Sequence, residues 1–170
     1  IRIAATIETA LGVYNAYEIA SASPRVFAIG LGAEDFRADM RMVRSETAEE
    51  ILFARNQISL CAHAAKVIPM DYVNSNFKDP EGFKADVAFG KKLGYTCKSC
   101  IHPNQIPLVH EVYTPTDKEI EQAKKVVAVY DEAMANGSGV VALDGKMIDM
   151  PIVIRARAAL EYAKAAGKEI

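Results

Sequence analysis

Short apolar runs alternate along the chain with longer stretches in which apolar residues recur at helical spacing. The runs expected to form strands are Ile1 to Ile7, Arg25 to Leu31, Val67 to Val73 and Tyr95 to Ile101. Strands that alternate with helices of about 10 to 20 residues are typical of parallel βαβ units. The pattern therefore predicts an α/β fold built from four such strands.

Capping-box spacing, a Ser or Thr followed three residues later by Glu, marks the start of two predicted helices. Thr47 and Glu50 begin the first, and Thr116 and Glu119 begin the second, which the Asn-Gly pair at 136–137 ends. Turn signals from 137 to 149 surround an apolar run that starts at Val140 and predict a short extended excursion. Further helices are expected between the first two strands, from Pro80 to Leu93, and from near Pro151.

Composition narrows the class of protein. The chain has 170 residues, of which 51% are hydrophobic and 25% charged, enough for one globular core. Its net charge is -2 and it contains no basic block, so we expect no nucleic-acid partner. Neither a membrane-length apolar run nor a signal peptide is evident, which favours a cytoplasmic protein without membrane attachment. The chain begins at Ile1 rather than Met, which suggests that residues precede it.

Two carboxylates directly follow apolar runs that are expected to be strands. Glu8 follows the first run, and Asp35 closes the Gly-Ala-Glu-Asp segment after the second. Parallel α/β folds place ligands at the carboxyl ends of their strands, where these acids would converge and repel unless a cation such as Mg²⁺ held them. The alternative is that each carboxylate only caps the next helix. If the alternation of the strand continues, the Glu34 side chain points to the opposite face from Asp35. Asp35 is therefore the preferred metal-ligand candidate of the two.

Three other motifs suggest a nucleotide, a polar ligand or zinc. Residues 30–35 begin like a dinucleotide fingerprint, but Asp35 stands where the third glycine belongs, and no phosphate-binding Gly-Lys-Ser or Gly-Lys-Thr loop occurs. The segment from His102 to Gln105 enters a helix and offers exposed amides to a polar ligand. The residues Cys61, His63, Cys97 and Cys100 have spacing that allows a zinc site, although buried free thiols are the favoured interpretation.

Asp149 stands directly before Met150-Pro151, the position of a helix N-cap followed by proline in the first turn. Capping is one interpretation of this carboxylate. The other is that the apolar residues Met147, Ile148 and Met150 surround it and raise its pKa toward the range of a general base. The sequence leaves both open.

Four motifs in order resemble the citrate lyase β-subunit family, which includes malyl-CoA and citramalyl-CoA lyases. They are Ile-Glu-Thr-Ala at 7–10, Gly-Ala-Glu-Asp-Phe at 32–36, Ile-His-Pro-Asn-Gln-Ile at 101–106 and Asp-Gly-Lys-Met-Ile-Asp-Met-Pro at 144–151. The resemblance implies strands five to eight and the C-terminal extension of a (β/α)₈ TIM barrel, a fold that usually needs about 250 residues. It implies a barrel part with its following helix at 1–136 and an extension at 137–170.

The resemblance also implies a reaction and its residues. The family cleaves a β-hydroxyacyl thioester into an acetyl thioester and a 2-oxo acid, with Mg²⁺ polarising the oxo-acid oxygen. The matching motifs assign Glu8 and Asp35 to the metal and Asp149 to proton transfer in an adjacent subunit. The implied contacts to the oxo acid are Glu8, Ala33 and Glu34, and those to coenzyme A are Ile101, His102 and Pro103.

The partners implied by the resemblance are an acyl-CoA or acyl-carrier-protein substrate, copies of the chain in a trimer or hexamer, and citrate lyase α and γ subunits. Cys97 stands where the family has glycine, and Cys100 where a small aliphatic residue is commoner. The family's basic substrate-binding residues belong to an N-terminal half that this sequence does not contain. A non-catalytic or assembly subunit and a 2-oxo-acid aldolase acting on non-thioester substrates therefore stay open as alternatives.

Overall fold

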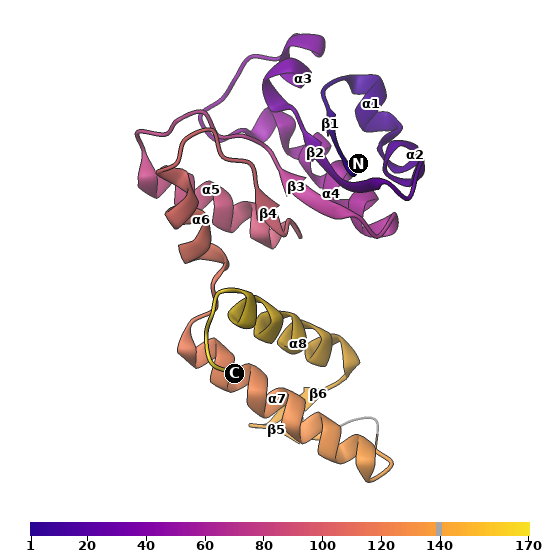
Figure 1. The fold of residues 1–170 in the computed structure, drawn as a ribbon, viewed down its shortest axis with the longest axis vertical. Coiled ribbons are helices and arrows are strands. Elements are labelled where there is room, and N and C mark those ends of the chain that lie inside the picture. Colours follow the sequence, from indigo (N-terminus) through magenta and orange to yellow (C-terminus); the bar gives the residue numbers. More distant parts are fainter. Residues whose placement is uncertain (139–140) are drawn as a thin grey trace. The chain divides into compact units, whose positions relative to one another are not determined.

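The computed structural model describes residues 1–138 and 141–170, which form two compact units, Ile1–Val109 and His110–Ile170 (Figure 1). The helix α6, Gln105–Tyr113, runs across the division. The other elements of the first unit are β1 Ile3–Ile7, α1 Ala10–Tyr14, α2 Ala16–Ser21, β2 Val26–Leu31, α3 Ala33–Asp39, the 3₁₀ helix η1 Glu49–Ile51, α4 Leu52–Ala64, β3 Ile68–Asp71, α5 Pro80–Lys92 and β4 Cys97–Lys98.

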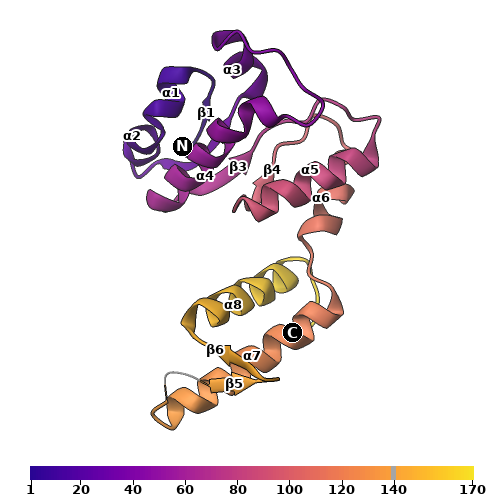
Figure 2. The same cartoon turned by 180° about the vertical axis from the view of Figure 1, so that it is seen from behind.

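The four strands of the first unit form one parallel sheet in the order β1-β2-β3-β4. Every crossover therefore moves in the same direction across the sheet. Because such crossovers are right-handed, their helices lie on one face. Helices α2 and α4 pack against the strands on that face (Figure 2), which confirms the predicted α/β fold with a parallel sheet.

The two faces of the sheet differ in side-chain size and burial. Ile7, Ile29 and Leu31 are buried in the core formed with the helices. Ala4 and Thr6 alternate with the buried positions of β1 and are exposed. The helix-covered face is therefore a packed core, while the opposite face of β1 carries small exposed residues.

The start predicted for α4, from the capping-box spacing of Thr47 and Glu50, is wrong. Residue Ala48 has a left-handed backbone with φ of 55°, η1 follows it, and α4 begins only at Leu52. The Glu50 carboxylate does not form the expected capping box, because it accepts hydrogen bonds from Arg37 and Ser45 instead. Burial would raise the pKa of Glu50, but these hydrogen bonds outweigh it and lower the pKa to about 2.

Two other elements of the first unit are shorter than the sequence suggested. The predicted helix between β1 and β2 is interrupted at Asn15, which separates α1 from α2. The fourth predicted strand reduces to Cys97–Lys98, paired with the end of β3. In contrast, α5 begins and ends within a residue of its predicted bounds, with Asp79 capping its first turn.

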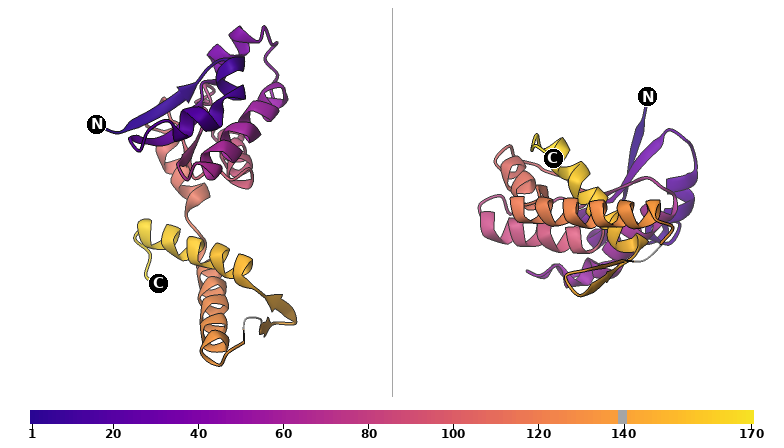
Figure 3. Two further views of the ribbon diagram at one scale, coloured as in Figure 1. Left: turned by 90° about the vertical axis from the view of Figure 1, so that its right-hand side faces the viewer. Right: turned by 90° about the horizontal axis from the view of Figure 1, so that it is seen from below.

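The second unit contains α7 Asp117–Ala135, β5 Val141–Leu143, β6 Lys146–Ile148 and α8 Met150–Ala165 (Figure 3). The predicted capping box of Thr116 and Glu119 is present. The extended excursion is an antiparallel hairpin whose turn residues, Asp144 and Gly145, both have positive φ. The expected strand residue Val140 lies outside the described residues.

The core of the second unit lies between α7 and α8. It contains Val126 and Tyr130 of α7 together with Val153 and Ala156 of α8. The helix α7 thus shares its core with the C-terminal residues, and the two compact units divide after Val109. Across the described ranges, none of the helices combines the length and apolar character needed to cross a membrane.

Candidate active site

Glu8 follows the last residue of β1 and does not cap the helix after it. Thr9 has that role, because its hydroxyl accepts a hydrogen bond of 3.0 Å from the Gly12 N–H. The Glu8 side chain instead lies against Gly32, at the end of the next strand. A Cβ atom at position 32 would lie 2.7 Å from Glu8 Oε1 and 2.4 Å from its Cγ. Gly32 therefore leaves the space that the Glu8 side chain occupies.

Asp35 lies in the first turn of α3, whose N-cap position is Gly32, so this carboxylate does not cap either. A cavity of about 240 Å³ brings the two acids together at the carboxyl ends of β1 and β2. Neither carboxylate forms a hydrogen bond or ion pair with another side chain in the part of the chain that the structure describes. The residues that line the cavity are Thr6, Glu8, Gly30, Leu31, Gly32, Ala33, Glu34, Asp35, Met70, Val73 and Ser99.

Glu34 also lines the cavity, but its carboxylate is already paired. Its Oε1 atom accepts from Arg37 Nη1 at 2.9 Å and from Arg44 Nη1 at 2.8 Å. Arg37 is buried and also donates to Glu50 at 2.6 Å. Two arginines thus pair with the Glu34 carboxylate through Oε1, whereas Glu8 and Asp35 have no ion pair among the described residues.

The donor set fits a hard divalent cation. Mg²⁺ typically takes one or two protein carboxylates and completes its octahedron with water and substrate oxygens, which matches two exposed acids facing one cavity. Across residues 1–138 and 141–170, three or more Cys, His, Asp or Glu side chains nowhere converge as ligands. The alternative zinc site is therefore not formed: Cys61 is buried, and His63 Nε2 lies 2.9 Å from the Gly94 carbonyl oxygen.

The residues expected on the coenzyme A side form the loop between β4 and α6. Ile101 and Pro103 are exposed, and the His102 ring stacks on Phe77 with centroids 5.1 Å apart. The expectation that 102–105 offers exposed amides is wrong for His102. The N–H groups of Ile101 and His102 both donate to Oε1 of buried Gln105, at 2.9 and 3.2 Å.

Asp149 belongs to the second unit, where it is the N-cap of α8. Its Oδ1 atom accepts a hydrogen bond of 3.3 Å from the Ile152 N–H, which confirms the capping interpretation. Its apolar neighbours Met147 and Met150 are exposed and do not enclose the carboxylate. The desolvated environment considered in the sequence analysis is therefore not provided by these two methionines.

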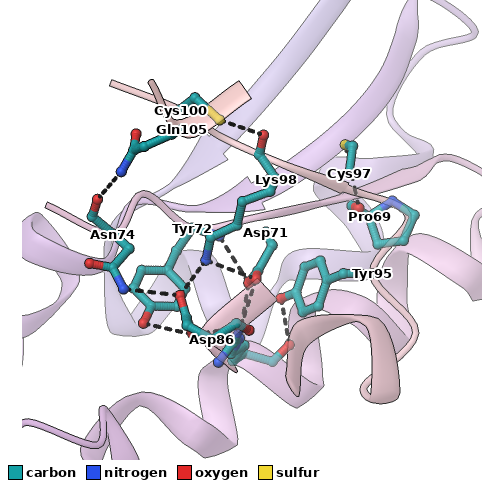
Figure 4. Close-up of polar contacts among 11 residues, drawn as sticks. Pro69, Asp71, Tyr72, Asn74, Asp86, Tyr95, Cys97, Lys98, Cys100 and Gln105 are labelled. Atoms are coloured by element: carbon teal, nitrogen blue, oxygen red, sulfur yellow. Dashed lines mark hydrogen bonds and ion pairs between the residues drawn. The ribbon is translucent and has the colours of Figure 1, made fainter. Parts of the chain in front are cut away.

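A buried ionic network includes Asp71, the last residue of β3 (Figure 4). The sequence analysis did not predict it. The ammonium group of Lys98 bonds Asp71 at 3.0 Å and Asp86 at 2.7 Å, and its side chain is 0% exposed. Arg55 donates to both oxygens of Asp71, at 2.9 and 2.6 Å. Two cations and two anions thus neutralise one another inside the protein.

Charged partners within this network shift the pKa values of Asp86 and Arg55. Burial would raise the pKa of Asp86, but Lys98 and Arg55 outweigh it and hold the pKa below its usual value. Burial would lower the pKa of Arg55, and Asp71 and Asp86 raise it instead. Both shifts favour the ionised forms of Asp86 and Arg55. The signal that could have found the network is Asp71 itself, a third acid at the end of an apolar strand.

Fold and site together define a parallel α/β protein with a carboxylate-lined cavity at the carboxyl ends of adjacent strands. The chain belongs to the HpcH/HpaI aldolase/citrate lyase family, whose model matches residues 1–103. This finding confirms the resemblance drawn from the four motifs.

Individual relatives support the same assignment. The chain is 45% identical over 161 residues to citrate lyase subunit beta of Leuconostoc mesenteroides subsp. cremoris, covering 95% of this chain and 53% of that protein. It is 34% identical over 159 residues to the mitochondrial citramalyl-CoA lyase of Rattus norvegicus, covering 89% of this chain and 47% of the relative. The chain thus spans about half the length of these curated relatives.

A solved structure extends the similarity to the fold. The CitE protein of Mycobacterium tuberculosis, in complex with magnesium, acetoacetate and coenzyme A, matches with a TM-score of 0.83 and 30% sequence identity. The match covers 96% of this chain and 61% of the CitE chain. That neighbour binds the metal and the cofactor that the motifs implied here.

Proposed function

We propose that this chain carries part of the active site of a Mg²⁺-dependent carbon-carbon lyase that cleaves a β-hydroxyacyl thioester into an acetyl thioester and a 2-oxo acid. The observation that carries the proposal is the cavity in which Glu8 and Asp35 meet with uncommitted oxygens. The relatives named as lyases, and the CitE complex with magnesium and coenzyme A, support the thioester chemistry.

The roles of the cavity residues follow from their chemistry. Glu8 and Asp35 would hold Mg²⁺, which polarises the oxygen that becomes the carbonyl of the 2-oxo acid. We assign Ala33 and Glu34 to the oxo-acid part of the substrate through their backbone, because Ala33 has no polar side chain and the Glu34 carboxylate is held by two arginines. Gly32 keeps the Glu8 carboxylate at the cavity.

Proton transfer at the acetyl carbon is assigned to Asp149. This acid would exchange a proton with the enolate carbon of the acetyl thioester, a step for which general acid-base catalysis typically contributes about 10² to 10⁴ in rate. We propose that it acts on the cavity of an adjacent subunit in a trimer or hexamer. Capping of α8 fixes the Asp149 backbone and orients its side chain.

We further propose that the sheet is strands five to eight of a (β/α)₈ barrel and that 137–170 form an extension after a barrel part at 1–136. The consecutive strand order and the helices on one face support a barrel, because doubly wound sheets reverse their order and carry helices on both faces.

The substrate carrier is coenzyme A or an acyl carrier protein, with citrate lyase α and γ subunits as partners in the carrier-protein case. We place this chemistry in the cytoplasm. The name of the Leuconostoc relative supports a subunit of a citrate lyase, whereas the citramalyl-CoA lyase supports coenzyme A as the carrier.

The metal assignment is tested by titrating the full-length protein with Mg²⁺ in a calorimeter. We expect Glu8→Gln and Asp35→Asn each to weaken binding about tenfold or more, since even outer partners of metal ligands have effects of this size. Gly32→Ala should also weaken binding, because the new Cβ displaces the Glu8 side chain.

The matched control is Glu18→Gln, which removes an exposed carboxylate on α2 away from the cavity. Its Mg²⁺ affinity should equal that of the wild type. Unchanged affinity in both Glu8→Gln and Asp35→Asn would place the metal elsewhere and overturn the proposed site.

A further inference from the structure

Gln105 is a buried amide with every polar atom in use. It begins α6, is 1% exposed, and bonds groups on both sides of its side chain. Its Oε1 atom accepts the N–H groups of Ile101 and His102, and its Nε2 atom donates to the Asn74 carbonyl oxygen at 3.0 Å (Figure 4). A buried amide is costly unless its hydrogen bonds are satisfied, so this geometry is strongly specified.

These hydrogen bonds join two loops at the carboxyl end of the sheet. Asn74 lies in the loop from 72 to 79 after β3, and Ile101 and His102 lie in the loop from 99 to 104 after β4. The stack of His102 on Phe77 and a 3.1 Å hydrogen bond from the Ser99 N–H to the Asp71 carbonyl oxygen add two further links.

Both loops reach the cavity of Glu8 and Asp35. Val73 from the first loop and Ser99 from the second belong to its lining. The joined loops therefore each contribute one residue to the lining of the cavity. Gln105 lies outside the cavity lining and acts on it through these neighbours.

The same hydrogen bonds decide what the second loop can present to a ligand. The N–H groups of Ile101 and His102 donate to Gln105 Oε1, and Pro103 has no N–H group. The Asn104 N–H donates to His102 Nδ1 at 3.2 Å. Within 101–103, the exposed side chains are that of Ile101, 54% exposed, and the Pro103 ring. Residues 101–103 thus offer no free backbone N–H, and their exposed apolar side chains suit the alkyl arm of a thioester better than its phosphates.

We propose that Gln105 is a positioning residue that joins the loops after β3 and β4 and so holds the Ile101–Pro103 surface in place for the thioester arm. This inference rests on the proposed function. It goes beyond the metal and proton-transfer residues, because it states that the affinity for the thioester depends on a buried amide that positions the binding surface.

The test is steady-state thioester cleavage by the full-length protein with Gln105→Met, which keeps the side-chain length and removes all three hydrogen bonds. We expect the KM of the thioester to rise about tenfold to a hundredfold, the range of leaving buried polar groups unpaired. Mg²⁺ affinity should stay within about twofold, because Glu8, directly after β1, and Asp35, in the first turn of α3, lie on other elements than the two joined loops. Gln57→Met on α4 is the matched control and should leave both quantities unchanged.

A second variant, Gln105→Glu, separates positioning from general damage to the fold. When protonated, the introduced carboxyl can accept both N–H groups and donate its O–H to the Asn74 carbonyl, reproducing the wild-type pattern. When ionised, it faces that carbonyl with a negative charge. The thioester KM relative to wild type should therefore be near one at acidic pH and rise as pH increases.

Amide hydrogen exchange gives a readout that does not depend on turnover. In Gln105→Met, the peptide containing Ile101 and His102 should exchange about tenfold faster or more, while β1 amides keep their protection. Faster exchange with an unchanged thioester KM would overturn the positioning role, as would a pH-independent KM in Gln105→Glu. Absence of thioester cleavage by the Mg²⁺-loaded wild type would instead contradict the proposed function.

Discussion

Replacing Asp71 with alanine lowers the free energy of unfolding of the protein by about 3 to 5 kcal/mol, the largest stability effect that the structure predicts. Asp71 is 1% exposed and accepts hydrogen bonds from Arg55 and Lys98. Its removal leaves two buried cations with only Asp86 to balance them. Urea unfolding followed by circular dichroism measures the loss.

An exposed ion pair on the neighbouring helix provides the control for Asp71. Glu81 of α5 bonds Lys84 at 2.9 Å and is 81% exposed, so Glu81→Gln should cost less than about 1 kcal/mol. Should Asp71→Ala prove too unstable to purify, Lys98→Met tests the same network by removing a buried cation instead of a buried anion. A loss below 1 kcal/mol in both network variants would contradict the stabilising role of the buried charges.

The second large effect is on turnover. Asp149→Asn should lower thioester cleavage about 10²-fold to 10⁴-fold, because an amide cannot exchange the proton that general acid-base catalysis requires. Asparagine is as good an N-cap as aspartate, so α8 should keep its stability. Mg²⁺ affinity should not change. Asp144→Asn is the matched control, since asparagine suits the positive φ of that turn and the residue has no assigned chemistry.

Mixing variants tests whether Asp149 serves an adjacent subunit. Oligomers assembled from Asp149→Asn and Glu8→Gln subunits should regain activity that neither variant has alone, because some cavities then combine an intact Glu8 with an intact Asp149 of a neighbour. Activity that stays absent in the mixed oligomers would contradict sharing between subunits, and full turnover by Asp149→Asn would contradict its role in proton transfer.

The sequence predicted those parts of the site that depend on position along a strand. Glu8 and Asp35 were found because each follows an apolar run, and parallel strands bring such ends together. Asp71 meets the same criterion but has a different role, because Arg55 and Lys98 neutralise it. These partners lie 16 and 27 residues away along the chain. Hydrophobic periodicity carries no information on such distant pairings.

Local spacing predicted helix starts only where tertiary contacts did not compete. The Thr116 and Glu119 capping box forms at an exposed helix start, whereas buried Arg37 draws Glu50 away from the same arrangement. The link from Gln105 to Asn74 spans 31 residues. The sequence drew attention to the Ile-His-Pro-Asn-Gln motif. It could not show that the side chain of Gln105 accepts hydrogen bonds from the N–H groups of Ile101 and His102.

Thioester cleavage by the full-length protein tests the central claim most directly. Citryl-CoA, malyl-CoA and citramalyl-CoA are each incubated with the protein and Mg²⁺, and again after chelation, and the released 2-oxo acid is measured. The account predicts release from at least one thioester that stops on chelation and is lost in Glu8→Gln. A folded, Mg²⁺-binding protein that cleaves none of them would contradict it, and cleavage of a free hydroxy-oxo acid instead would identify a 2-oxo-acid aldolase.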